Sequence, residues 1–390
     1  MLTRRKFLGS AAAGAAMMLR TTTSSAREMA GTQRLFVGTS SQTEFTGHGE
    51  GIFVTSFRDG RLGSPRLLAK VTSPSFLAVP QAGHPLFAVL GGDDGASRAA
   101  SYAISQGHDV ATTTLTPIDT ASSGGGGGCH VSASPDGRCV FVSNYGGGSV
   151  ASFHADSSGK LTQASVIRFP PTEHGPVQDR QEGSHVHSAM VSPDGAFVLV
   201  NDFGLDRIHV FGLDRATAKL TPHRPDHWLS EPGSGPRHLV FHPNGRWIYC
   251  ICELNSTVVQ LQWNATHGVL TPKSVAKTLP DGVDAAKARG CEMVFSKDMR
   301  FLYASNRRAS ESFAVFAVDA STGALTKIQN KPNPGLEARH IAVDPSGRWF
   351  LVANQFSGDV TVFALDMATG HIGEPVSKIE VSGASCLLFA

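Results

Sequence analysis

Residues 237–261 read RHLVFHPNGRWIYCICELNSTVVQL, and the pattern of these residues predicts the fold. It holds a short apolar run, a Pro-Asn-Gly turn, a second apolar run, a polar break and a third apolar run. Proline fixes φ and glycine tolerates a positive φ, so the triplet predicts a tight turn between antiparallel strands. The same order recurs in four other stretches, which begin at Cys129, His187, Cys291 and Arg339. The chain is therefore built from a repeated β-unit.

The spacing of these repeats indicates seven units. The turns of the five stretches lie at Pro135, Pro193, Pro243, Lys297 and Pro345. An earlier unit fits around Pro80, and the last apolar run, residues 386–390, continues at the front of the chain in residues 34–38 and 51–55. Repeats of this length with several short strands are typical of a β-propeller. We predict an all-β, seven-bladed β-propeller with four-stranded blades, closed by pairing of the C-terminal strand with N-terminal strands. A two-sheet sandwich, the competing all-β fold, does not explain why the sequence pattern begins again seven times.

The first 30 residues predict an export signal. Adjacent Arg4 and Arg5 precede an apolar run over residues 9–19, and the small residues Ser24 to Ala26 follow. This order resembles a twin-arginine signal peptide. The apolar run is shorter than the ~20 residues that a membrane-spanning helix needs. We divide the chain into a signal peptide with linker, 1–30, and a propeller domain, 31–390. We expect export by the twin-arginine translocase, a periplasmic or secreted location, and no membrane association after cleavage.

Composition narrows the class of partner. The 390 residues include 42 Gly, which suits many tight turns, and the formal net charge of +2 gives no electrostatic reason to bind nucleic acid. We therefore expect a small molecule, a lactone or a carboxylate, as the partner. The six cysteines have no paired spacing and several lie in apolar runs, so buried free thiols are expected.

Aligning the units locates the candidate site. Antiparallel pairing places the start of the first strand and the end of the second at one mouth of the central channel. Six residues before the turn the units carry Pro74, Cys129, His187, Arg237, Cys291, Arg339 and Ser385. Ten residues after it they carry Tyr145, Phe203, Glu253, Arg307 and Gln355. These positions vary and collect charge, which favours a functional pocket over a ring of solvated rim charges.

Two other motifs favour structural roles. His130, His238 and His340 share one repeat position, which favours hydrogen bonds to neighbouring blades. Three histidines can form a zinc site, but equivalent positions in separate blades are expected to lie too far apart. We predict no metal and no cofactor. Gly124 to Gly128 is expected to be a flexible loop, because no helix or lysine follows as a phosphate loop requires.

At these residues the chain resembles the seven-bladed propeller lactonase family, from about residue 31 to residue 390. That family includes propeller-type 6-phosphogluconolactonases and fungal 3-carboxy-cis,cis-muconate lactonizing enzymes. The most specific segments are residues 183–187, 235–238, 252–254 and 305–307. The resemblance implies a catalytic set of one histidine, two arginines and a glutamate, matched here by His187, Arg237, Arg307 and Glu253. We add His185, Arg339, Tyr145 and Gln355 as substrate-binding residues; Ala338 precedes Arg339 where the family often has proline.

The residue types suit acyl chemistry. Lactone hydrolysis needs an activated water, a stabilised oxyanion and a proton for the leaving alkoxide. Glu253 or His187 can act as the general base, and Arg237 with Arg307 can hold a carboxylate, a phosphate or the oxyanion. We predict a 6-phosphogluconolactonase-like lactonase that acts on a sugar-acid lactone. The predicted export favours a substrate without a phosphate group. A muconate-type cycloisomerase and a non-catalytic ligand-binding propeller are the alternatives.

Overall fold

The computed structural model describes residues 31–41, 49–80, 85–92, 95–105, 109–170 and 172–390, and the predicted signal peptide lies outside them. Within these ranges the chain forms strands, turns and loops, with no α-helix. Accordingly, none of the described segments is a helix that could cross a membrane.

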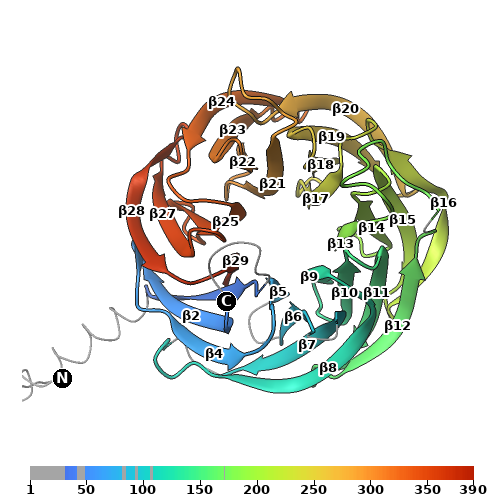
Figure 1. Cartoon of the computed structure of the whole chain (residues 1–390), viewed down its shortest axis with the longest axis horizontal. Coiled ribbons are helices and arrows are strands. Elements are labelled where there is room, and N and C mark those ends of the chain that lie inside the picture. The colour runs from blue at the N-terminus through green and yellow to red at the C-terminus, as the bar shows by residue number, and fades with distance from the viewer. Residues whose placement is uncertain (1–30, 42–48, 81–84, 93–94, 106–108, 171) are drawn as a thin grey trace, which may run out of the picture.

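Seven antiparallel sheets stand around a central channel, as the sequence predicts (Figure 1). Three blades come from the first half of the ring. They contain β5 (Phe76–Ala78), β6 (Leu86–Leu90), β7 (Ala96–Ile104) and β8 (Leu115–Gly126); β9 (Gly128–Ala133), β10 (Cys139–Asn144), β11 (Ser149–Ala155) and β12 (Leu161–Arg168); and β13 (Val186–Val191), β14 (Phe197–Asp202), β15 (Arg207–Asp214) and β16 (Lys219–Leu229).

Three more blades follow in the same order from the channel outward. They contain β17 (Pro236–Phe241), β18 (Trp247–Cys252), β19 (Thr257–Asn264) and β20 (Val269–Lys277); β21 (Ala288–Phe295), β22 (Phe301–Arg308), β23 (Ser312–Val318) and β24 (Leu325–Pro332); and β25 (Ala338–Val343), β26 (Trp349–Asn354), β27 (Asp359–Leu365) and β28 (Ile372–Glu380).

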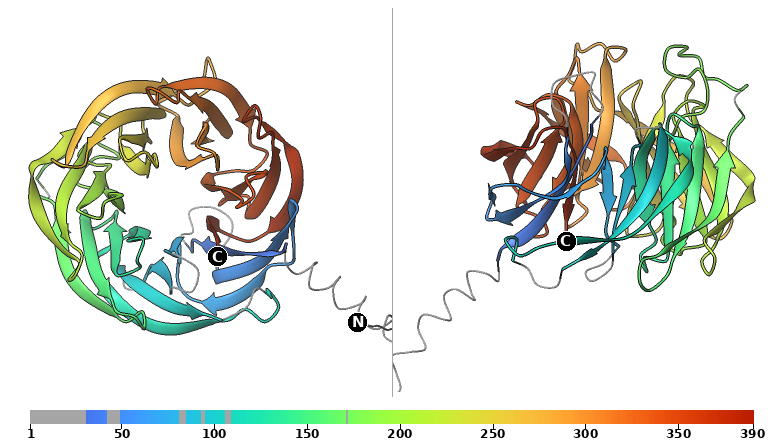
Figure 2. Two further views of the ribbon diagram at one scale, coloured as in Figure 1. Left: turned by 180° about the vertical axis from the view of Figure 1, so that it is seen from behind. Right: turned by 60° about the horizontal axis from the view of Figure 1, so that its bottom comes forward.

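The seventh sheet closes the ring with both ends of the domain. It joins β29 (Ala384–Phe389) to β1 (Gln33–Thr39), β2 (Gly51–Arg58), β3 (Arg61–Leu62) and β4 (Arg66–Lys70). Leu35 pairs with Phe389 and Val37 with Leu387. Figure 2 shows the C-terminus lying among the blue N-terminal strands. This confirms the predicted closure, which leaves no unpaired sheet edge between the two ends.

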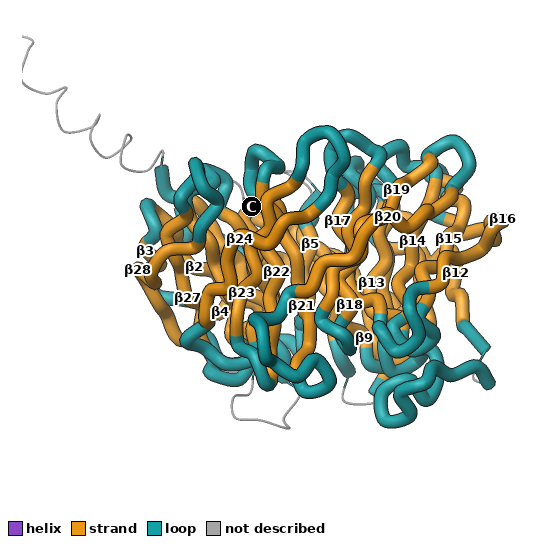
Figure 3. The backbone as a smooth tube through the Cα atoms, turned by 90° about the horizontal axis from the view of Figure 1, so that it is seen from above, coloured by secondary structure: helices purple, strands orange, loops and turns teal. Residues whose placement is uncertain are grey.

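The hydrophobic core lies between the blades. The sheets stand side by side (Figure 3), so their middle strands are covered on both faces. All six residues of β18 are buried. Tyr249 and Ile251 pack against Met293 and Phe295 of the next blade. Strands covered on both faces read as continuous apolar runs rather than alternating ones. Fully burying one such side chain contributes about 1.5–3 kcal/mol.

The turns between the first two strands of each blade follow the predicted chemistry. Gly245 has a φ of 68°, and the side chain of Asn244 accepts a 2.9 Å hydrogen bond from the backbone N–H of Arg246. The equivalent residue without a glycine, Met299, still has a φ of 62°. The turn geometry is thus kept even where the sequence lacks the favourable residue.

A β-bulge recurs near the start of the innermost strands. Val186 pairs with Asp202 and Ser188 with Asn201, so His187 has no partner in β14. The same skip occurs at Cys129, Arg237, Arg339 and Ser385. A bulge re-aims a side chain away from the regular alternation of a strand. These bulge residues occupy the position six residues before the turn. The repeat alignment identifies that position as functional because its residue type varies between units.

The glycine run at 124–128 is not a loop, and that prediction was wrong. β8 continues to Gly126 and β9 begins at Gly128. A side chain on Gly125 would place its Cβ 2.6 Å from the amide nitrogen of Asn144. The glycines are required by close packing of this strand end against the neighbouring strand, a constraint that composition alone does not reveal.

Candidate active site

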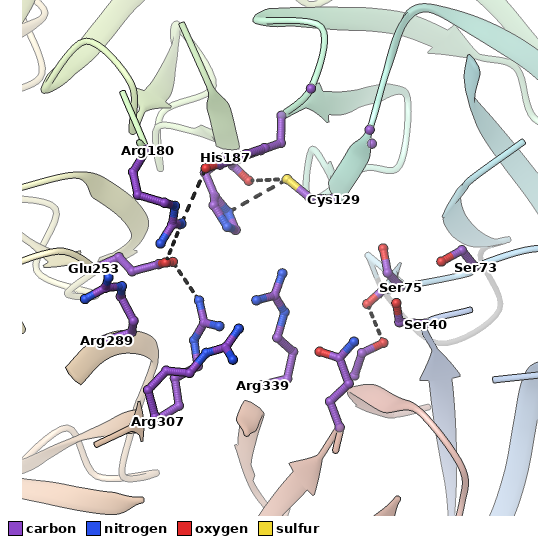
Figure 4. Close-up of a pocket in the computed structure, with 17 residues that line it drawn as sticks. Ser40, Ser73, Ser75, Cys129, Arg180, His187, Glu253, Arg289, Arg307 and Arg339 are labelled. Carbon is purple, nitrogen blue, oxygen red and sulfur yellow. Dashed lines mark hydrogen bonds and ion pairs between the residues drawn. The ribbon is translucent and has the colours of Figure 1, made fainter. Parts of the chain in front are cut away.

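A cavity of about 620 Å³ opens at the channel mouth where the innermost strands begin (Figure 4). Its lining includes six of the eight predicted site residues: Tyr145, His187, Glu253, Arg307, Arg339 and Gln355. Two cavity residues that directly follow the second strand of their blades are held by equivalent backbone hydrogen bonds. The backbone N–H of Glu253 donates to the carbonyl of Gly235 at 2.8 Å, and that of Gln355 to Glu337 at 2.9 Å.

The other two predicted residues lie behind this lining. Arg237 is buried at 2% exposure, and its guanidinium donates to the backbone carbonyl of Cys291 and to Glu253. His185 stacks on Tyr145 with ring centroids 4.4 Å apart, and its Nδ1 lies 3.0 Å from the carbonyl oxygen of Tyr145. His185 therefore supports the Tyr145 ring rather than facing the cavity.

Glu253 is the centre of the charged network. Its Oε1 lies 2.9 Å from Nη2 of Arg180, and its Oε2 lies 3.1 Å from Nε of Arg237. Nη2 of Arg307 lies 2.8 Å from the same Oε2. Burial alone raises the pKa of Glu253, but these arginines, led by Arg307, outweigh it and hold the pKa well below its usual range. A carboxylate in this state is a poor proton acceptor and a strong orienting group.

Arg307 belongs to a second ion pair as well. Its Nη1 contacts the buried carboxylate of Glu337, and Nε of the neighbouring Arg308 lies 3.3 Å from Oε2 of Glu337. Two carboxylates therefore fix Arg307 in place. This rigid guanidinium forms one wall of the cavity.

Arg339 differs from the other arginines. It points into the middle of the cavity in Figure 4. Within the described part of the chain its side chain has no hydrogen bond and no ion pair. Burial, and then the nearby Arg307 and Arg237 cations, lower its pKa. Arg339 is thus a partly buried cation in the cavity without a counter-ion among the described residues, which favours an anion or a developing oxyanion at that place.

His187 lies at the bulge of β13 with 3% exposure. Burial, followed by the Arg237 cation and the His238 ring, holds its pKa well below the usual value, so its imidazole is neutral at pH 7. The Cys129 thiol lies 3.8 Å from Nδ1 of His187 and 3.2 Å from its carbonyl oxygen. Burial raises the pKa of Cys129 to about 11, so this sulfur is a protonated thiol rather than a nucleophile.

Sequence reasoning missed several residues of the cavity. Arg180 comes from the irregular segment between β12 and β13, which is longer than the equivalent connections in the other blades. Its guanidinium lies 5.0 Å from the Phe203 ring centre. Arg289 and Arg308 also line the cavity. Both lie within two residues of an aligned position in their blade. A repeat alignment that includes the adjacent residues would therefore identify them.

The three channel histidines come closer than expected. The rings of His130 and His238 have centroids 5.1 Å apart, so the expectation that separate blades hold them far apart was wrong. Nδ1 of His238 bonds Glu292 of the next blade at 2.8 Å, and Nδ1 of His340 accepts the backbone N–H of Leu387 at 3.4 Å. The predicted links between blades are thus confirmed for His238 and His340, whereas Nδ1 of His130 has no hydrogen-bond partner among the described residues. In the described ranges no cluster of three or more His, Cys, Asp or Glu is arranged to hold a metal.

All six cysteines are free, as predicted. The polar residue that ends the second strand, β14, bonds locally: the side chain of Asp202 accepts from Ser184 at 2.6 Å and from the backbone of His185 at 3.0 Å. These residues hold the loops that surround the cavity.

The model of the seven-bladed β-propeller lactonase family matches residues 34–389. The chain belongs to this family. A 6-phosphogluconolactonase from Formosa agariphila is 32% identical over 360 residues, covering 90% of this lactonase and 98% of the relative. The 6-phosphogluconolactonase of Bacillus subtilis is 29% identical, with 91% and 97% covered.

Solved structures agree with this assignment. The structure of a periplasmic gluconolactonase from Pseudomonas aeruginosa superposes with a TM-score of 0.83 at 31% identity, and covers 92% of this chain and 99% of that one. Family and relatives confirm the predicted class, a lactonase and therefore a hydrolase.

Proposed function

We propose that this lactonase hydrolyses a sugar-acid lactone in the cavity at the channel mouth. The observation that carries the proposal is the pairing of a neutral His187 with an uncompensated Arg339 in one cavity. The names of the relatives, among them a periplasmic gluconolactonase, support a sugar-acid lactone as the substrate class.

In the proposed mechanism the lactone carbonyl oxygen faces Arg339. Neutral His187 takes a proton from water while the water oxygen bonds to the carbonyl carbon. Arg339 stabilises the oxyanion of the tetrahedral intermediate. The ring C–O bond then breaks, and the His187 imidazolium returns its proton to the leaving alkoxide. The product is an open-chain hydroxy acid, released as its carboxylate.

Glu253 has a different role in this proposal. Its depressed pKa argues against general-base catalysis, because an acceptor with so little affinity for a proton activates water poorly. Its three ion pairs instead support a positioning role for Arg180, Arg237 and Arg307. Those arginines hold the polar wall against which the substrate binds.

Replacing His187 by Gln should lower kcat/KM for glucono-1,5-lactone by about 100-fold to 10,000-fold, the usual contribution of a general base. Because burial depresses the pKa of His187, wild-type kcat/KM should rise with pH below 6.5 and stay flat above it. Stopped-flow detection of proton release measures both. His371→Gln, in an outer turn, is the matched control and should match wild type. Full activity in His187→Gln would rule out this base.

We infer that residues 1–30 direct export, since adjacent arginines, an apolar run and small residues occur in order. Changing Arg4 and Arg5 together to Lys should retain the precursor in the cytoplasm of the producing bacterium, because the twin-arginine translocase reads the arginine pair. Fractionation with immunoblotting measures this. Lys6→Arg is the control and should export normally. Equal export of the double variant would contradict twin-arginine targeting.

A further inference from the structure

The cavity has two chemically different sides (Figure 4). Arg180, Arg289 and Arg307 lie on one side, and Arg339 stands between the sides. Ser40, Ser73 and Ser75 lie on the opposite side. Two further neutral residues also line the cavity: Ser385, whose Oγ donates to the carbonyl oxygen of Ser75 at 3.0 Å, and Gln355, which follows β26. We call these five residues the neutral wall. None of its members carries a charge, so its hydrogen-bonding chemistry differs from that of the arginine side.

The neutral wall is assembled where the ring closes. Ser73 and Ser75 lie between β4 and β5, Ser385 is the bulge residue of β29, and Gln355 follows β26. Ser73 has a φ of 49°, a left-handed backbone that serine rarely adopts. Such conformations persist where the surrounding fold enforces them, and they gather at ligand sites. The wall is therefore built by separate parts of the chain rather than being one exposed loop.

Several groups of this wall have unused hydrogen-bonding capacity. Among the described residues, none is a hydrogen-bond partner of the buried hydroxyl oxygen of Ser75. The amide of Gln355 forms no hydrogen bond with any described residue. Ser73 Oγ accepts a 3.1 Å hydrogen bond from the backbone of Ser41 and donates none of those described, so its proton is available. Polar groups sheltered from water are normally paired, and unpaired ones indicate a missing ligand group.

We infer that the neutral wall binds the hydroxyl groups of a polyhydroxylated lactone and sets the specificity of the enzyme. This inference rests on the proposed function, because it takes the lactone carbonyl to lie at Arg339. Donors and acceptors without charge match the alternating donor and acceptor character of sugar hydroxyls. A carboxymuconate offers carboxylates and an unsaturated chain but no hydroxyl, so it would leave the wall unpaired. Gln355 and Ser75 are the proposed specificity-determining residues.

The experiment compares two substrates of the same ring size. Glucono-1,5-lactone carries hydroxyl groups, whereas δ-valerolactone carries none. Wild type should prefer the sugar lactone in kcat/KM. Gln355→Leu keeps the approximate volume and removes the amide, so it should lower kcat/KM for gluconolactone about 10-fold to 100-fold and leave δ-valerolactone within about 2-fold. Ser75→Ala breaks no intramolecular hydrogen bond and should act in the same direction, by about 3-fold to 10-fold.

Gln262→Leu, on the exposed outer side of β19, is the matched control and should leave both substrates unchanged. Rates are taken after subtraction of spontaneous hydrolysis. A parallel fall on both substrates in Gln355→Leu would overturn the specificity role while leaving lactone hydrolysis at this site intact. Equal wild-type preference for the two lactones would overturn it as well. Wild type inert toward both would instead refute the proposed function.

Discussion

Glu253→Gln should lose both lactonase activity and stability. The carboxylate is 1% exposed and compensates three guanidinium groups, two of them buried. Glutamine has similar size but no charge, so Arg237 and Arg307 would remain buried with one counter-charge fewer. Removing one partner of a buried ion pair costs about 3–5 kcal/mol. Loss of the oriented arginines should lower kcat/KM by at least about 1,000-fold.

Urea unfolding at several pH values tests this prediction. The folded-state pKa of Glu253 is depressed below the unfolded value of about 4.3. The stability that this carboxylate contributes is therefore complete above that unfolded value and is lost as the pH falls toward the folded pKa. The difference between wild type and Glu253→Gln should be largest at pH 7 and shrink below pH 4.

Glu374→Gln is the control for this substitution. Glu374 pairs with Lys331 at 2.6 Å, but its side chain is 84% exposed, and exposed pairs contribute about 0–1 kcal/mol. Its loss should change neither activity nor unfolding measurably. Wild-type stability in Glu253→Gln would show that the buried arginines do not depend on this carboxylate.

Arg339→Met should have the opposite effect on stability. This guanidinium has no counter-ion in the described part of the chain, and Arg307 and Arg237 repel it. Methionine fills a comparable space without a charge, so the free energy of unfolding should rise. Activity should nevertheless fall about 100-fold to 1,000-fold, because the oxyanion loses its cationic donor. An increase in Tm together with a loss of kcat is the expected signature of a functional cation kept at a cost to the fold.

Arg307→Met provides the contrast. Arg307 pairs with Glu253 and Glu337, so its removal should lower stability and activity together. Calorimetry and steady-state kinetics on both variants separate the two roles. If Arg339→Met were less stable than wild type, Arg339 would have to make compensating contacts, and the oxyanion role would lose its main support.

The repeated sequence predicted the fold well because each blade is specified locally. A turn triplet and two apolar runs determine one hairpin, and the missing strand of the last unit identifies the closure of the ring. The same alignment found His187 and Arg339, since each occupies the bulge position of its own blade. Lactonase family membership confirms the predicted enzyme class.

Other features depend on contacts between units, which one sequence does not contain. Arg180 reaches Glu253 from a connection between β12 and β13 that is longer than its equivalents in the other blades. The pairing of Arg307 and the lack of pairing of Arg339 depend on where Glu337 lies in space. The glycine run has the composition of a loop, and its constraint, the side chain of Asn144, lies in the neighbouring blade.

At each bulge, the residue that faces the channel mouth is not one of the residues that pair the two strands. A residue such as Cys129, Arg237 or Ser385 has no partner across the strand ladder, so its identity is not dictated by strand pairing. Exchanging it changes the channel mouth while every hydrogen-bonded neighbour keeps its register. Each bulged blade thus presents one residue at the channel mouth whose exchange does not alter strand pairing. New lactonase specificities should therefore be sought by varying Cys129 and Ser385 jointly on this scaffold, while His187, Arg237 and Arg339 are kept.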